Sequence, residues 1–76
     1  MKYLVIEIQT NSDGTVANIV TAKDSRLEAE STYHGILAAA AISKVPQHAA
    51  VMLTSEGTYL ASQCYEHELQ AVEPGE

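Results

Sequence analysis

The sequence has little cysteine, few basic residues and no long apolar run, and each shortage excludes a class of protein. Cys64 is the only cysteine among the 76 residues, so no disulfide can form within the chain. Four Lys and Arg residues stand against ten Asp and Glu residues, which gives a formal charge of −6. Binding to nucleic-acid phosphates needs clustered Lys and Arg, so we expect no nucleic-acid partner. No apolar stretch approaches the ~20 residues that span a bilayer, so we expect no membrane partner either.

Recognisable catalytic motifs are absent as well. The glycines are too isolated to form a phosphate-binding loop, and no serine lies in a nucleophile motif. Cys64 would need a nearby histidine in an electropositive setting to act as a nucleophile. His67, three residues further on, falls on the opposite face of a regular strand. We therefore expect no enzyme activity and interpret Cys64 as a small core or interface hydrophobe.

The length indicates one small domain. We expect residues 1–68 to form a single α+β domain and residues 69–76 to form a short, acidic, frayed tail. A chain this short buries only about 60% of its unfolded surface, and such domains often gain stability from a metal or a partner subunit. Residues 1–8 are too short an apolar stretch for a signal peptide, so we expect a reducing, cytoplasmic location.

Two β-hairpins are predicted, one on each side of a helix. Asp13-Gly14 and Glu56-Gly57 supply the turn residues of the two hairpins. The four predicted strands are residues 2–9, 15–23, 48–54 and 58–66. In the first strand, alternate residues point to opposite faces. One face carries Leu4, Ile6 and Ile8, and the other carries Tyr3, Val5 and Glu7.

The predicted helix begins after Ser25 and ends near Ser43 or Lys44. Ser25 and Glu28 have the spacing of a capping box, in which each residue satisfies a backbone N–H at the start of the helix. Pro46 disfavours helical angles at the residue before it, so the helix has ended by then. The order ββαββ predicts an α+β fold, a four-stranded antiparallel sheet with one helix packed across one face. The order of the strands stays open.

The helix carries no charged residue from Ser31 to Ser43. At 100° per residue, one apolar group gathers around Leu27 together with Ser31, His34, Leu37, Ala38, Ala41 and Ile42. A second group comprises Ala29, Tyr33, Ile36 and Ala40. Together the groups cover roughly 240°, far more than the ~100° stripe that one sheet requires, so a second protein surface is expected on the helix.

The simplest second surface is another copy of the chain, so we expect a homodimer. The predicted interface residues on the helix are Tyr33, Ile36, Leu37, Ala40 and Ala41. The alternative contact surface is the open face of the sheet, to which this interpretation assigns Tyr3, Val5 and either Tyr59 or Tyr65.

Four side chains are weak candidates for metal ligands. Glu30 and His34 are four residues apart, so they meet on one face of the helix. His48 and His67 lie near strand ends and could converge with that pair. The spacing matches no recognised metal signature, so we expect no metal and no cofactor. His34 is instead expected to be partly buried and hydrogen-bonded to Glu30 or to backbone.

Two segments resemble a known group of proteins. "YLVIEIQTNSDGT" at the start and "EAESTYHGILAAAAISKVPQHAAVML" in the middle are similar to an uncharacterised family of small proteins from Gram-positive bacteria and their prophages. The resemblance runs from about Tyr3 to His67, and it implies a phage or prophage origin. The family has no established activity, so the resemblance assigns no catalytic residue.

These observations predict a non-enzymatic assembly or protein-interaction module, to which the resemblance adds a phage or prophage origin. Two alternatives stay open at this point. The first is a small metal-binding protein that uses Glu30 and His34 with His48 or His67. The second is an acidic regulator or inhibitor of a host protein.

Overall fold

The computed structural model describes residues 2–67, and the predicted tail at residues 69–76 lies outside them. The elements in chain order are β1 (Tyr3–Thr10), β2 (Val16–Lys23), α1 (Arg26–Ala41), β3 (Gln47–Thr54) and β4 (Tyr59–Glu66). The prediction of a ββαββ α+β fold is confirmed, and the ends of each strand lie within one residue of the predicted ends.

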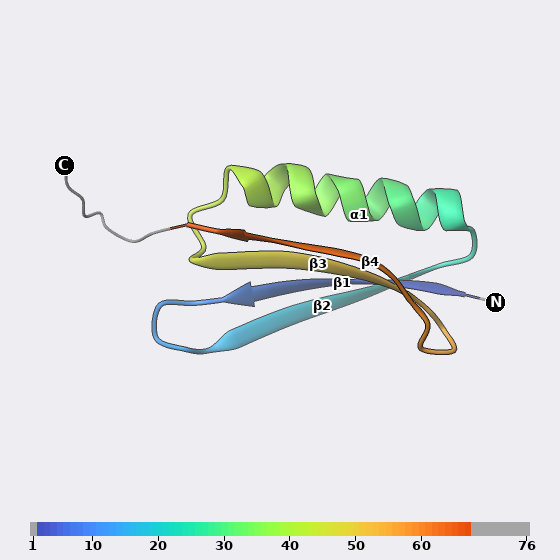
Figure 1. Ribbon diagram of the computed structural model, residues 1–76, viewed down its shortest axis with the longest axis horizontal. Coiled ribbons are helices and arrows are strands. Elements are labelled where there is room, and N and C mark those ends of the chain that lie inside the picture. Colours follow the sequence, from blue (N-terminus) through green and yellow to red (C-terminus); the bar gives the residue numbers. More distant parts are fainter. Residues whose placement is uncertain (1, 68–76) are drawn as a thin grey trace.

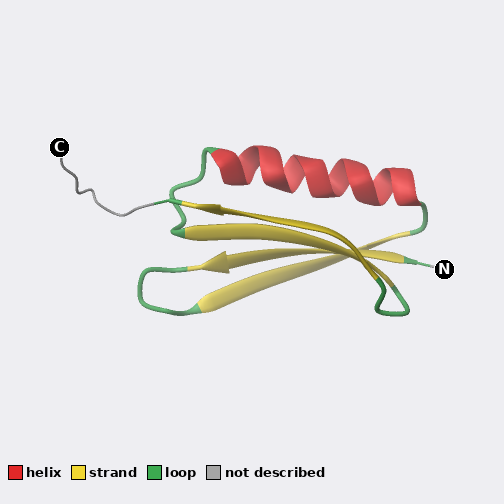
Figure 2. Ribbon diagram, viewed as in Figure 1, coloured by secondary structure: helices red, strands yellow, loops and turns green. Residues whose placement is uncertain are grey.

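The sheet has the strand order β2-β1-β3-β4, and every neighbouring pair is antiparallel. β1 and β3 are therefore the central strands, and they join the two hairpins into one sheet (Figure 1). Because β2 and β3 both run antiparallel to β1, they run parallel to each other, and α1 is the crossover between them. Figure 2 shows α1 lying along one side of the sheet, while no other element within residues 2–67 covers the opposite side.

Local interactions fix the turn and the helix start where the sequence predicts them. Gly14 has a φ of 90°, a backbone angle that residues with a Cβ rarely adopt, and Asp13 accepts a hydrogen bond from the Thr15 N–H at 2.9 Å. At the helix start, Ser25 Oγ accepts from the Glu28 N–H at 3.2 Å, which confirms the predicted N-cap. The helix ends at Ala41, two residues before the nearer predicted end.

The core lies between α1 and one face of the sheet. Its buried members are Val5, Ala29, Tyr33, Leu37, Ala50 and Met52. We call this side of the sheet the covered face; its central strands contribute Tyr3, Val5, Glu7 and Gln9 of β1 and His48, Ala50, Met52 and Thr54 of β3. Burying these side chains supplies the main stabilisation of so small a domain.

The structure corrects two expectations about which side chains face the core. Tyr3, Val5 and Tyr65 pack in or against the core, so they are not on the open face of the sheet. The physical reason is that Val5 and Met52 are paired neighbours on the two central strands, directly beneath α1. Tyr59, in contrast, is exposed.

The second correction concerns which apolar group of the helix is left uncovered by the sheet. The group of Ala29, Tyr33, Ile36 and Ala40, joined by Leu37, packs on the sheet, whereas the group around Leu27 faces outward. Leu27 is 78% exposed and Ile42 is 85% exposed. The apolar arc of the helix is therefore wider than the sheet covers, as the sequence indicates, but its uncovered part is the group around Leu27.

Candidate functional site

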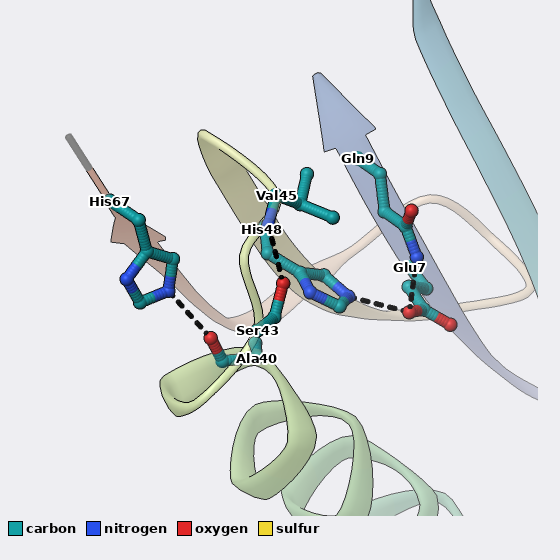
Figure 3. Close-up of polar contacts among 7 residues, drawn as sticks. All are labelled: Glu7, Gln9, Ala40, Ser43, Val45, His48 and His67. Carbon is teal, nitrogen blue, oxygen red and sulfur yellow. Dashed lines mark hydrogen bonds and ion pairs between the residues drawn. The ribbon is translucent and has the colours of Figure 1, made fainter. Parts of the chain in front are cut away.

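A histidine and a glutamate meet across the two central strands, on the covered face. His48 Nε2 of β3 lies 2.6 Å from Glu7 Oε2 of β1, and Gln9 Nε2 donates to the same oxygen at 3.0 Å (Figure 3). The side chain of His48 is 5% exposed and that of Glu7 is 21% exposed. The imidazole is therefore shielded from water and the carboxylate is partly shielded, which strengthens a hydrogen bond to a charged group.

These contacts determine the charge of Glu7. The hydrogen bond from His48 is the largest influence, and it holds the pKa of the Glu7 carboxyl below its ordinary value. Burial acts in the opposite direction, while the hydrogen bond from Gln9 lowers the pKa further. Nδ1 of His48 is buried without a hydrogen-bond partner among residues 2–67. The imidazole therefore makes one strong contact, to Glu7, and that contact joins β1 to β3.

Around the C-terminal end of the helix, further polar contacts fasten the chain. His67 Nε2 lies 2.8 Å from the carbonyl oxygen of Ala40, and the His67 N–H donates to the Pro46 carbonyl at 2.7 Å. The Val45 N–H donates to Ser43 Oγ at 2.9 Å (Figure 3). These contacts hold the helix end, the following loop and the end of β4 together. His67 adds a second donor to the Ala40 carbonyl at the end of the helix, which also accepts from the Ser43 N–H at 3.2 Å.

The four weak metal candidates lie apart from one another. Glu30 Oε2 accepts from Arg26 Nε at 3.1 Å, whereas the ring of His34 lies edge-on to Tyr33 and is exposed. The expectation that His34 is partly buried is therefore wrong. His48 and His67 make the separate contacts described above. Within residues 2–67, no group of three or more His, Cys, Asp or Glu residues is placed to hold a metal ion.

A shallow recess opens on the covered face beyond the edge of the helix. It is open to solvent and is lined by Glu7, Gln9, Ala17 and Ile19. β2 is the edge strand at this side, and its residue Ile19 is exposed. Glu7 lines the recess and His48 does not, so the recess combines one acidic residue with the amide of Gln9 and the apolar side chains of Ala17 and Ile19.

A second uncovered surface is the other side of the sheet, which we call the open face. Register assigns to it Leu4, Ile6, Ile8 and Thr10 of β1, Val16, Asn18, Val20 and Ala22 of β2, Gln47, Ala49, Val51 and Leu53 of β3, and Tyr59, Ser62, Cys64 and Glu66 of β4. The aliphatic side chains gather on the central strands, and Thr10, Gln47 and Glu66 lie together at one end.

The open face is exposed and nearly free of charge. Val20 is 55% exposed, and the central residues Leu4, Ile6 and Val51 are partly exposed. Glu66 is the only Asp, Glu, Lys or Arg among the residues that define the face. An apolar patch of this kind is typical of a surface that contacts another protein, because soluble proteins seldom leave large apolar patches in water.

The predicted helix interface overlaps the core of the chain. Tyr33, Leu37 and Ala40 are buried, and Ile36 is half-buried against the core. Ala41 is exposed. Four of these five residues therefore already pack within the chain, and only Ala41 offers surface to a partner. Association itself stays a prediction.

Sequence reasoning did not find the Glu7–His48 pair. The two residues lie 41 positions apart, and they meet only because β1 and β3 are neighbours in the sheet. A signal was present, since Glu7 is the one charged residue among the apolar residues of its strand and His48 begins another strand. A buried carboxylate needs a partner, so Glu7 could have directed a search for one on the neighbouring strand.

Comparison with known proteins adds no relative. No protein-family model, no curated protein and no solved structure matches the chain. Within residues 2–67, the structure contains no helix with the length and apolar character that crossing a membrane requires.

Proposed function

We propose that this chain is a non-enzymatic assembly module that works by burying the open face of its sheet against another protein surface. The observation that carries the proposal is the continuous aliphatic centre formed by Leu4, Ile6, Val51 and Leu53 on paired strands. Such a surface gains free energy when it leaves water, at roughly 25 cal/mol per Å².

The other features of the chain support the same proposal. The His48 imidazole, the most buried polar group near the helix end, is shielded from solvent, and its contact with Glu7 joins two strands. Cys64 lies on the open face and is exposed, which suits a reducing compartment such as the cytoplasm. An origin in a prophage, where small assembly proteins are encoded, stays part of the proposal through the sequence resemblance.

A matched set of variants tests the proposal. Ile6→Lys with Val51→Lys places two charges in the centre of the open face, and Ile42→Lys places one on the outer side of the helix end. Each protein is immobilised and exposed both to soluble copies of itself and to other soluble proteins. We expect the wild type and Ile42→Lys to retain a partner and the double variant to lose it. Equal retention by all three proteins would contradict the proposal. Circular dichroism confirms that each variant is folded.

A further inference from the structure

We infer that the partner of the open face is a second copy of this chain, packed sheet against sheet about a two-fold axis. The inference rests on the proposed function, because it names the occupant of the same face. It differs from the helix-mediated dimer expected from the sequence, since the helix residues Tyr33, Leu37 and Ala40 are already buried within the chain.

The size of the face suits a dimer. Each strand is eight residues long. At ~3.3 Å per residue and ~4.8 Å per strand, four such strands form a surface of roughly 26 by 19 Å. Each copy therefore presents about 500 Å², and two copies together bury about 1,000 Å², the area at which a specific interface becomes credible. A smaller partner, such as a single strand or helix, would leave part of the aliphatic centre in water.

The distribution of charge also selects a second copy. Two copies of a chain with a formal charge of −6 repel each other, so they can associate only where charge is scarce. The open face is such a place, because Glu66 is its one charged residue and lies at the end of an edge strand. Other acidic residues, including Asp24, Glu28 and Glu30, lie in or just before α1, on the far side of the sheet. Face-to-face packing therefore keeps these carboxylates on the two outer surfaces.

The pattern of the face is compatible with two-fold symmetry. In an isologous interface the same patch meets itself, so an apolar centre must lie on the axis. Ile6 and Val51 are directly paired on the central strands, and they lie near the middle of the face. An axis through this point places the aliphatic centre of one copy on that of the other. Packed sheets lie ~10 Å apart with strands crossing at about −30°, which gives a helix–sheet–sheet–helix arrangement of four layers.

Cys64 supplies a direct reporter, because it is exposed in the single chain and lies on the open face. Light scattering after size exclusion should give about twice the 8.2 kDa chain mass at micromolar concentration. The rate at which a thiol reagent modifies Cys64 should fall as the protein concentration rises. In the variant with Ile6→Lys and Val51→Lys, the dimer dissociation constant should rise by about tenfold or more, because the charges would be buried unpaired. Ile42→Lys should change neither measurement.

Two results would overturn the inference, and they differ from a failure of the proposed function. A chain that stays monomeric at all concentrations, yet retains a different protein through the open face, would keep the function and exclude the second copy. A dimer that leaves Cys64 fully reactive, or that persists in the double variant, would mean that the copies associate through another surface. A wild-type chain that binds neither itself nor another protein would contradict both the inference and the proposed function. Binding that the open-face charges leave unchanged would also contradict both.

Discussion

The two faces of the sheet both carry apolar side chains, but they differ in their polar groups and in whether the helix covers them. The covered face combines small residues such as Ala50 with the buried pair of Glu7 and His48. The open face carries Leu4, Ile6 and Ile8, and within residues 2–67 it has no buried polar pair and no element packed over it.

The difference teaches that apolar content does not determine which side of a sheet receives the helix. The small side chains of Ala29, Ala40 and Ala50, all fully buried, allow α1 to approach the sheet closely. Tyr33 fills the remaining space and, through burial, has a pKa above its ordinary value. The core between α1 and the covered face therefore combines large and small residues, as close packing requires.

The largest difference in stability is expected between two variants of β3 that place one glutamate on the covered face or on the open face. Ala50→Glu buries an unpaired carboxylate in the core and overpacks it, so it should cost about 4 kcal/mol or more and leave the chain largely unfolded. Ala49→Glu, on the open face, should cost less than about 1 kcal/mol. Urea unfolding of both variants at low protein concentration measures the difference. Similar losses would show that the two faces are equally buried.

The same contrast should appear on the two sides of the helix. Leu37 is buried on the sheet and Leu27 is exposed, so the two leucines form a matched pair. Leu37→Ala should lower the free energy of unfolding by about 2–5 kcal/mol through lost burial and a cavity. Leu27→Ala should change it by less than about 0.5 kcal/mol. If Leu27→Ala proves as costly as Leu37→Ala, the outer side of the helix is buried by a partner.

Removing the contact between Glu7 and His48 should have a smaller effect on stability, and this effect should depend on pH. Glu7→Ala leaves His48 buried without its partner and should cost about 1.5–3 kcal/mol, whereas Glu7→Gln should cost less because the amide oxygen still accepts. The pKa of Glu7 is lowered in the folded chain, so its stabilisation is present above the ordinary glutamate pKa. That stabilisation is lost as the pH falls through the folded-state pKa.

Urea midpoints measured between about pH 5 and pH 3 check this sign. The midpoint of the wild type should fall more steeply on acidification than that of Glu7→Gln, which has no carboxyl at this position. Parallel curves for the two proteins would show that the contact between Glu7 and His48 contributes no stability.

The smallest effect is expected on the exposed side of the helix. Glu30 contacts Arg26 and not His34, and the side chains of both Glu30 and Arg26 are substantially exposed. A double-mutant cycle between Arg26→Ala and Glu30→Ala should give a coupling of about 0.3–0.5 kcal/mol. The cycle between Glu30→Ala and His34→Ala should give a coupling near zero. A larger value for the second cycle would restore the pair that the helix spacing predicts.

Local sequence signals were sufficient for the elements of the fold. Alternation in β1, the glycine turns and the N-cap at Ser25 each depend on neighbouring residues, and the structure places all of them as predicted. The helix end was overestimated because Ile42 and Ser43 are acceptable helix residues, and Pro46 acts only on the residue before it.

Relations between distant elements could not be predicted in the same way. The face that β1 turns to the helix was assigned to Leu4, Ile6 and Ile8, and it is in fact the face of Tyr3 and Val5. A crossover between parallel strands is almost always right-handed, so handedness can fix the covered face once the strand order is known. The strand order was the part of the topology that the sequence left open, and the Glu7–His48 pair depends on it as well.

The central position of β1 and β3 has a consequence for how the chain folds. Each hairpin can form from neighbouring residues, but the β1–β3 pairing joins Tyr3 to Thr54 and requires the whole segment between them to close into a loop. Until it closes, each hairpin has one more unpaired edge than in the folded sheet. We therefore expect folding to be limited by the docking of two preformed halves, at the slower rates of proteins rich in non-local contacts. In a concentrated solution, β1 of one molecule could then pair with β3 of another, so dilute refolding favours the correct partner within the chain.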